Sequence, residues 1–286
     1  MGGDLTAAGL PAALAAVDRW DAGFAAAGAA RAGVTAAVHG DTARVIRVAS
    51  ITKLVTAWAV LLPGEEAAPS PGERPGAPGE RLGRPGSTVR HLLCHAGGLD
   101  FDTATVRAPP GRRRIYSNTG YELLADHVAE RTGIGFADYV AEGVLGPLDM
   151  AATELRGSAA KDLWSNVDDL LVFAAELRSP VVLDAATAED ARSPQLPDLA
   201  GVLPGWGRQD PCWWGLGPEL RGTKSPHWTG ATAAPGTYGH FGGAGTFLWV
   251  DPVADASCVV LTDREFDDWA VRAWPPFSDA VRAALT

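Results

Sequence analysis

The chain has 286 residues and a formal net charge of −10 at pH 7, and hydrophobic residues make up 47% of it. This size and composition suit one or two compact domains with a hydrophobic core. The acidic balance and the lack of a basic patch argue against nucleic acid as a partner. The longest apolar runs, such as Leu54–Leu62, are far shorter than the roughly 20 residues of a membrane span, so no membrane partner is expected.

The amino terminus and the cysteines together indicate a cellular compartment. Asp4 and the absence of a basic cluster ahead of the first apolar stretch do not fit a signal peptide. Cys94, Cys212 and Cys258 are widely spaced and odd in number, so no disulfide framework follows from them. These features predict a cytoplasmic protein. They leave the oligomeric state open.

The first 62 residues predict two helices with two strands between them. Leu10–Ala29 is rich in alanine and is expected to form an amphipathic helix. Gly33–Gly40 and Ala43–Ala49 are expected to form a hairpin around a Gly-Asp turn. Ser50 then opens a helix that ends at Pro63. Because that helix is apolar nearly all round, we expect it to be buried.

The middle of the chain is expected to be mainly helical. Pro63–Gly86 is rich in proline, glycine and charged residues and predicts a surface loop. Leu196–Pro235 shows no regular periodicity and is expected to be irregular, although it carries four of the ten tryptophans. The helices expected in this part are Val89–Cys94, Tyr121–Thr132, Phe136–Leu145 and Val167–Leu177.

Strand-like runs return near the carboxyl terminus. They are Thr237–Phe241, Gly245–Val250 and Ser257–Thr262, followed by a helix over Phe266–Leu285. The chain therefore predicts an α+β fold in which both ends build one antiparallel sheet flanked by terminal helices. The domain boundaries follow: residues 1–53 and 236–286 form a discontinuous sheet domain, and residues 54–235 form a mainly helical domain.

Ser50 and Lys53 are candidate catalytic residues because they lie three positions apart at the start of the buried helix. A serine hydroxyl is a weak nucleophile that needs a base within hydrogen-bond reach. Lysine normally keeps its proton up to about pH 10.4, but burial and nearby cations lower its pKa. The alternative is a helix cap at Ser50 with a lysine that extends to water.

The S-x-x-K spacing occurs twice in this chain, so it is weak as a signal on its own. The second copy is Ser158-Ala-Ala-Lys161. It is followed by Asp162 and has no buried helix behind it, and we therefore favour Ser50 as the nucleophile.

Two further motifs follow in order, Tyr116-Ser117-Asn118 and His240-Phe241-Gly242. With them the chain resembles the serine β-lactamase and penicillin-binding-protein superfamily, and it is most similar to its class C β-lactamases, D-peptidases and esterases. The segments "VRHLLCHAGGL" and "SNVDDLLVFAAEL" add to the resemblance, which covers roughly residues 34–261. The resemblance implies a β-lactamase-like fold and an acyl-enzyme mechanism without a metal or other cofactor.

The resemblance also implies a role for each motif residue. Ser50 would be acylated, Lys53 would act as base, and Tyr116 would share proton transfer, with the order of these two left open. Asn118 would orient the substrate and hold Lys53, and His240 would interact with the substrate or tune Tyr116. The oxyanion hole would be formed by the backbone N–H groups of Ser50 and Gly243. The residues expected to bind substrate are Ser117, Phe241, Gly242 and Trp214.

Several features separate this chain from the pattern of the superfamily. His240 stands where many members carry lysine, which weakens the case for binding the carboxylate of a β-lactam. The expected cytoplasmic location also argues against a role in defending or trimming a cell wall. His91 and His95 are spaced as zinc ligands would be on a helix, but no third ligand accompanies them, so no metal is expected.

The sequence therefore predicts a serine hydrolase that acts on a small-molecule ester, or an amide, through an acyl-Ser50 intermediate. An acyltransferase would use the same residues with an alcohol or amine in place of water. A non-catalytic binding protein is the alternative from another class, and Lys53 more than about 4 Å from Ser50 would favour it. A third alternative is a scaffold that docks partners through the Pro/Gly-rich loop.

Overall fold

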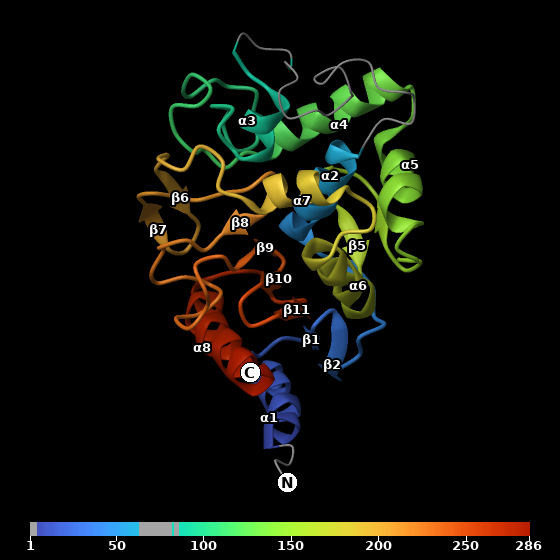
Figure 1. Ribbon diagram of the computed structural model, residues 1–286, viewed down its shortest axis with the longest axis vertical. Coiled ribbons are helices and arrows are strands. Elements are labelled where there is room, and N and C mark those ends of the chain that lie inside the picture. Colours follow the sequence, from blue (N-terminus) through green and yellow to red (C-terminus); the bar gives the residue numbers. More distant parts are fainter. Residues whose placement is uncertain (1–4, 63–81, 83–85) are drawn as a thin grey trace.

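The computed structural model describes residues 5–62, 82 and 86–286 (Figure 1). The α-helices are α1 (Leu5–Leu14), α2 (Thr52–Leu61), α3 (Val89–Leu93), α4 (Asn118–Thr132), α5 (Phe136–Val140), α6 (Val167–Arg178), α7 (Ala185–Arg192) and α8 (Asp268–Leu285). Shorter helical turns are η1 (Ala15–Arg19), η2 (Ala49–Ile51) and the π-turn η3 (Ala141–Leu145). The loop expected over Pro63–Gly86 lies outside the described residues, apart from positions 82 and 86.

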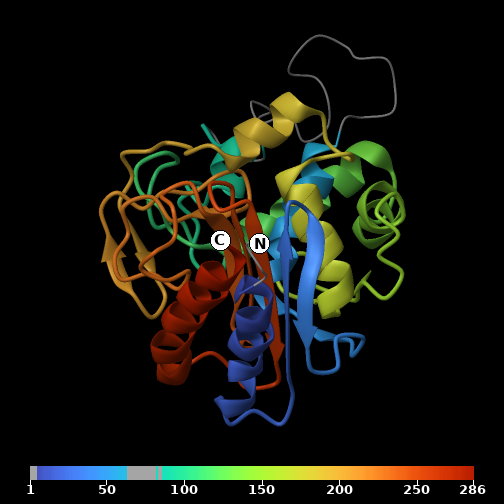
Figure 2. The same cartoon turned by 60° about the horizontal axis from the view of Figure 1, so that its bottom comes forward.

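The main sheet has six antiparallel strands in the order β2-β1-β11-β10-β9-β8. Its strands are β1 (Ala25–Arg31), β2 (Val34–His39), β8 (Glu219–Leu220), β9 (Tyr238–Gly242), β10 (Thr246–Asp251) and β11 (Ala256–Thr262). β1 and β11, from opposite ends of the chain, pair directly, with Ala25 opposite Thr262. Helices α1 and α8 lie side by side on one face of the sheet (Figure 2). The α+β fold built from both chain ends is thus confirmed.

Two small sheets also lie within the described residues. One is formed by β3 (Ile46–Arg47), β5 (Leu163–Ser165) and β4 (Glu154–Leu155), and the other by β6 (Gly201–Leu203) and β7 (Gly207–Gln209). The described helices include none that is long and apolar enough to cross a bilayer. The domain boundaries after residues 53 and 235 stay a prediction, as does the cytoplasmic compartment. Strand β8 extends the main sheet into the segment 54–235.

The helix predicted over Leu10–Ala29 is wrong in its second half. Helical structure ends at Arg19, and Ala25–Arg31 is strand β1, inside the sheet between β11 and β2. Alanine favours helix, but here tertiary packing outweighs local propensity. Small side chains suit this strand because helix α6 lies very close to it: a Cβ on Gly28 would stand 2.7 Å from Leu171 Cδ1 and 2.8 Å from Val167 Cγ1.

The hairpin predicted over residues 33–49 is also wrong in its pairing. The strand at Val34–His39 exists, but it pairs with β1 through a turn at Ala32 and Gly33. Both turn residues have positive φ, 52° and 77°, which is the conformation that a tight two-residue hairpin requires. Of the second expected strand only Ile46–Arg47 is formed, and it pairs with β5 in a different sheet.

The remaining elements follow the expectations with small shifts. Helix α4 begins at Asn118, three residues earlier than expected, because Ser117 caps it by accepting a hydrogen bond from the Gly120 N–H. Helix α7 was not expected. The region 196–235 contains the short strands β6, β7 and β8 and is otherwise irregular.

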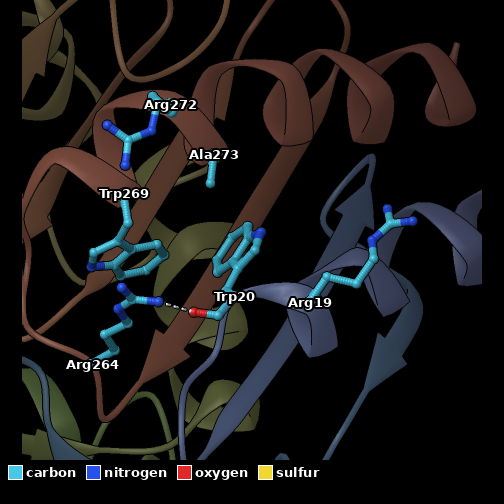
Figure 3. Close-up of a pocket in the computed structure, with 6 residues that line it drawn as sticks. All are labelled: Arg19, Trp20, Arg264, Trp269, Arg272 and Ala273. Carbon is cyan, nitrogen blue, oxygen red and sulfur yellow. Dashed lines mark hydrogen bonds between the residues drawn. The ribbon is translucent and has the colours of Figure 1, made fainter.

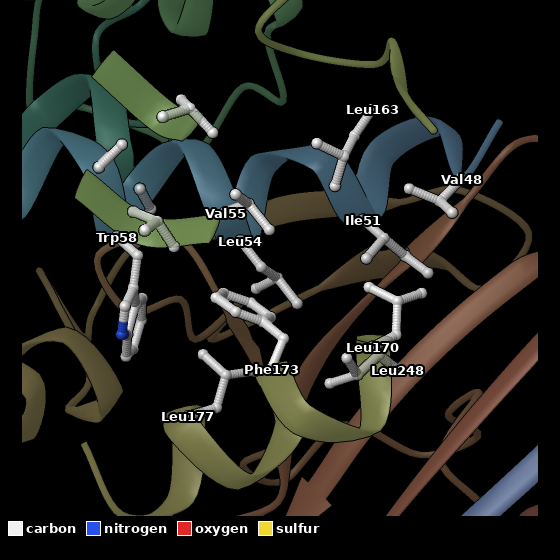
Figure 4. Packing of buried hydrophobic residues seen from close by; sticks show 14 of the residues in the cluster. Val48, Ile51, Leu54, Val55, Trp58, Leu163, Leu170, Phe173, Leu177 and Leu248 are labelled. Carbon is white, nitrogen blue, oxygen red and sulfur yellow. The ribbon is translucent and has the colours of Figure 1, made fainter. Parts of the chain in front are cut away.

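Helix α2 is buried along its whole length, as its composition predicted. Its Leu54 and Val55 pack with Leu170 and Phe173 of α6, and with neighbouring strands (Figure 4). Trp58 donates its indole N–H to Glu176 Oε1 at 3.1 Å. Each such apolar side chain contributes about 1.5–3 kcal/mol relative to exposure. The core therefore holds α2 rigidly, and with it Lys53 in its first turn.

Candidate active site

Ser50 lies in a tightly held turn immediately before α2. The residue before it, Ala49, has a φ of 48°, a left-handed conformation that is costly for a residue with a Cβ. Thr52 Oγ1 donates to the Ala49 carbonyl at 2.5 Å, and Thr246 Oγ1 donates to the Val48 carbonyl at 2.8 Å. Sheet and helix therefore both fix the backbone from which the Ser50 hydroxyl projects.

Lys53 is completely buried and makes three polar contacts. Its Nζ lies 3.4 Å from Ser50 Oγ, 2.6 Å from Asn118 Oδ1 and 2.8 Å from the Ala160 carbonyl oxygen. The structure thus brings Ser50 and Lys53 together, as their spacing predicted, and adds Asn118, as the resemblance implied. The separation of Lys53 from Ser50 is below the 4 Å limit beyond which a binding protein would be favoured.

Burial lowers the pKa of Lys53 from 10.5 to about 7. Three charged side chains modify this desolvation effect. Glu122 and Asp102 raise the pKa of Lys53 and Lys161 lowers it. Near neutral pH a large share of the protein therefore carries Lys53 as a neutral amine, which is the form that accepts a proton.

Tyr116 connects Ser50 with His240. The Tyr116 hydroxyl lies close enough to Ser50 for their hydrogen bonding to lower the pKa of Tyr116, and it is 3.4 Å from His240 Nε2. His240 Nδ1 is 2.7 Å from the Phe241 carbonyl oxygen, which only accepts, so this nitrogen carries the ring proton of neutral His240. Nε2 then has a free lone pair, which accepts the Tyr116 proton when that proton is not directed to Ser50.

Burial keeps Tyr116 and His240 neutral. Desolvation raises the pKa of Tyr116 well above its usual range, and it lowers the pKa of His240 to about 3. Tyr116 is therefore a proton donor near neutral pH, and His240 brings no positive charge to the site.

The end of β9 approaches the Ser50 turn closely. A Cβ on Gly242 would lie 2.5 Å from the Val48 carbonyl oxygen and 2.4 Å from Thr246 Oγ1, so only glycine fits this position. Beside it, Gly243 is exposed, and a Cβ there would meet nothing within 4 Å. The strand end thus borders Ser50 and leaves open space in front of Gly243, where the resemblance puts the oxyanion hole.

The remaining expected site residues differ in where their side chains lie. Trp214 packs against Tyr116 and His240, with ring centroids 5.9 and 5.7 Å apart. Ser117 uses its hydroxyl for the α4 cap and for a 2.6 Å bond to the Asp100 carbonyl. Phe241 is buried in an aromatic cluster with Trp206, Trp228, Phe247, Phe266 and Trp274. The structure therefore does not bring the side chains of Ser117 and Phe241 to Ser50.

His95 and Asp102 take part in the site but were not expected there. The His95 ring lies 4.4 Å from the Tyr116 ring, and its Nδ1 accepts the Ser117 backbone N–H at 3.2 Å. Asp102 Oδ1 accepts Asn118 Nδ2 at 2.8 Å. His95 lies within "VRHLLCHAGGL", a segment that resembles the superfamily, so its involvement could have been inferred from the sequence. Asp102 lies in an irregular loop and offered none.

The zinc spacing of His91 and His95 does not produce a metal cluster. His91 Nδ1 lies 2.8 Å from Thr88 Oγ1, and His95 uses Nδ1 for the Ser117 N–H. Across residues 5–62, 82 and 86–286, no group of three or more His, Cys, Asp or Glu side chains could hold a metal ion.

The described surface includes one cavity next to Asn118 and another next to Trp20. One of about 590 Å³ borders Asn118 and is lined by Asp102, Ala104, Asn118, Thr119, Glu122, Ser158 and Lys161. The other, of about 240 Å³, is lined by Arg19, Trp20, Arg264, Trp269, Arg272 and Ala273. In the second cavity Arg264 packs over Trp269, whereas Arg19 points away from both tryptophans (Figure 3). The guanidinium groups of Arg19 and Arg264 therefore do not converge on one point in this cavity.

Comparisons with known proteins identify the family. The Beta-lactamase family model matches residues 12–279. A crystal structure described as a beta-lactamase from Mycobacterium bovis is 45% identical, covers 96% of this chain and 99% of its own, and superposes with a TM-score of 0.90.

More distant structures share the fold. A hydrolase described as having promiscuous acyltransferase activity is 18% identical, covers 97% of this chain and 98% of its own, and has a TM-score of 0.73. Unliganded simvastatin synthase from Aspergillus terreus is 17% identical, covers 98% of this chain and 99% of its own, and has a TM-score of 0.70. A comparison with curated proteins finds no match. The chain belongs to the Beta-lactamase family, in the superfamily of serine β-lactamases and penicillin-binding-protein-like proteins.

Proposed function

We propose that this protein is a serine hydrolase that cleaves a carboxylic ester through an acyl-Ser50 intermediate. One observation carries the proposal: Ser50 lies within reach of both a buried lysine with its pKa near 7 and a buried, protonated tyrosine. A base and an acid with separated pKa values beside one hydroxyl are what acyl transfer requires.

The contacts of Lys53 support its role as the base. A neutral amine has two N–H groups and one lone pair. The carbonyl oxygens of Asn118 and Ala160 only accept, so they take the two N–H groups at 2.6 and 2.8 Å. The lone pair is then left for the third neighbour, the Ser50 hydroxyl at 3.4 Å. Lys53 would take the Ser50 proton as Oγ attacks the ester carbonyl carbon.

The second half of acylation requires an acid and an oxyanion hole. The backbone N–H groups of Ser50 and Gly243 would stabilise the negative oxygen of the tetrahedral intermediate, and each such donor contributes about 10²–10³ in rate. The Tyr116 hydroxyl would protonate the departing alkoxide and regain a proton from Lys53. Water then attacks the acyl carbon while Lys53 takes one of its protons. The bond from that carbon to Ser50 Oγ breaks, Oγ regains the proton from Lys53, and the carboxylic acid is released.

The charge of the site favours an ester over a β-lactam. A β-lactam carries a carboxylate that needs a cationic partner, and burial keeps His240 neutral. The similarity to a structure described as a beta-lactamase supports β-lactam hydrolysis as a second candidate. The acyltransferase alternative is supported at the level of the fold by the two distant structures whose descriptions name acyltransferase or synthase activity.

The test is intact mass spectrometry of the protein during turnover of p-nitrophenyl esters of increasing acyl length. The proposal predicts an adduct of the acyl mass on the wild type and none on Ser50→Ala. A chromogenic cephalosporin in a parallel reaction tests β-lactam hydrolysis. Added short alcohols test acyl transfer, since a transferase would divert product from acid to ester. Ester turnover without an adduct on Ser50 would contradict the proposal.

A further inference from the structure

One wall of the cavity of about 590 Å³ is connected to Lys53 through Asn118. Asn118 lies between the two, with its carbonyl oxygen 2.6 Å from Lys53 Nζ and its NH₂ group 2.8 Å from Asp102 Oδ1. Asp102 in turn lies 3.8 Å from Lys161 Nζ. A chain of polar contacts therefore runs from the exposed Lys161 to the buried Lys53.

Asp102 determines which way the Asn118 amide faces. A carboxylate only accepts hydrogen bonds, so the amide must present its NH₂ group to Asp102. The Asn118 oxygen is then directed to Lys53, where it takes one of the two N–H groups of the neutral amine. If the amide turned over, its NH₂ group would face Lys53 and compete with Ser50 for the lone pair.

The second S-x-x-K segment supplies the rest of this arrangement. Its Ala160 carbonyl takes the other N–H of Lys53, at 2.8 Å. Its Lys161 pairs with Asp102, and its Ser158 is held by Glu122. Three charged side chains thus shift the pKa of Lys53: Glu122 from α4, Asp102 from the preceding loop and Lys161 from the second segment. The charge of Lys53 in turn lowers the pKa values of His95 and His240.

We propose that Asp102 is a positioning residue of the reaction, which fixes the Asn118 amide so that Lys53 faces Ser50 with its lone pair, and that Lys161 balances its charge. The proposal rests on the hydrolase function above. Asp102 contacts neither Ser50 nor Lys53 directly, and its side chain is half exposed. Its substitution is therefore compatible with a folded protein.

The experiment measures the rate at which a fluorophosphonate probe labels Ser50, as a function of pH. Asp102→Leu removes the acceptor, and we expect labelling to slow by about 10- to 100-fold at its plateau, as for a misplaced catalytic group. Asp102→Asn can still accept from Asn118 through its own amide oxygen, so it should rescue most of the plateau rate. Asp126→Leu, an exposed position on α4, is the control for loss of a carboxylate.

The pH profile distinguishes positioning from general damage. Asp102→Asn removes a negative charge, so the acid limb should move to lower pH, whereas Lys161→Met removes a positive charge and should move it to higher pH. Both shifts should shrink in about 1 M salt, because the two side chains are exposed enough to be screened.

Each failure has its own signature. Equal plateau rates and equal profiles in wild type and Asp102→Leu would overturn the positioning role. The positioning role would also be overturned if Asp102→Leu and Asp102→Asn lost the plateau labelling rate equally and the acid limbs of Asp102→Asn and Lys161→Met did not move in opposite directions. That result would indicate a structural defect only. Absence of labelling in the wild type would instead refute the hydrolase proposal itself.

Discussion

Ser50 and Ser158 each precede a lysine by three residues, but the two lysines lie in opposite surroundings. Lys53 is fully buried with its Nζ 3.4 Å from its serine, whereas the Lys161 side chain is 44% exposed and faces Asp102. Ser158 donates its hydroxyl to the Glu122 carboxylate, whereas its own lysine faces Asp102. Spacing alone places serine and lysine on one side of a turn, and burial decides whether the lysine can act as a base.

The two segments also meet in space. The second one packs on α2, where Thr56 Oγ1 donates to the Ala159 carbonyl at 2.6 Å, and the next carbonyl, of Ala160, accepts from Lys53. The Ser158–Lys161 segment, which has no proposed catalytic role, therefore packs against the Ser50–Lys53 segment and forms part of its surroundings. Ser158–Lys161 thus supports the Ser50–Lys53 pair structurally.

The largest expected difference is between the two serines. Ser50→Ala should reduce ester hydrolysis by about 10³-fold or more, because it removes the nucleophile of a concerted set of residues. Ser158→Ala should retain activity within about fivefold. Steady-state kinetics with a p-nitrophenyl ester measures both. A loss in Ser158→Ala as large as that in Ser50→Ala would end the distinction between the two segments.

The lysines should differ nearly as much. Lys53→Met should lower kcat by about 10²–10⁴-fold, the usual contribution of a general base. Lys161→Met should stay within about threefold of wild type at alkaline pH, since its effect is on the pKa of Lys53. Near-equal loss in both variants on the alkaline plateau would contradict the assignment of Lys53 as the base.

The pH dependence of the wild type tests the protonation state of Lys53. Its neutral form is the active one and its pKa is about 7, so kcat/KM should fall tenfold per pH unit below about pH 6.5 and level off above about pH 8. His240, with its pKa lowered to about 3, and Tyr116, with its pKa raised, should add no transition between pH 5 and 9. A profile without an acid limb in this range would contradict a buried lysine base.

The smallest expected effect is on the stability that Glu122 provides by holding the Ser158–Lys161 segment. Glu122 accepts from Ser158 Oγ and from the Ala159 N–H at 3.3 Å, so Glu122→Gln should cost about 1 kcal/mol and lower the melting temperature by about 2–4 °C. Glu130→Gln, at an exposed position of the same helix, should leave it unchanged. Thermal unfolding followed by circular dichroism makes the comparison. Equal melting temperatures in the two variants would show that Glu122 does not hold the second segment.

Much of the site was predictable because its motifs combine local spacing with distinctive residue types. Ser50 and Lys53 share one helical turn, and Tyr116 and Asn118 flank the cap of α4. Their joint arrangement with His240 followed from the resemblance to the superfamily. Asp102 was not predictable, because its role depends on a loop whose path is set by tertiary contacts.

The errors in the predicted secondary structure and side-chain directions have a related origin. The alanine-rich stretch before Arg31 has high helix propensity, but its position between β2 and β11 makes it a strand. Phe241 and Ser117 belong to correctly located motifs, yet their side chains face the core and the helix cap. A motif gives positions along the chain, and the direction of each side chain depends on the packing around it.

Activation of Ser50 by the buried Lys53 is tested most directly by intact mass after exposure to a fluorophosphonate probe, for the wild type, Ser50→Ala and Ser158→Ala. We expect one adduct on the wild type and on Ser158→Ala, and none on Ser50→Ala. An adduct that persists in Ser50→Ala, or an unlabelled wild type that is folded, would contradict the claim that burial of Lys53 activates Ser50.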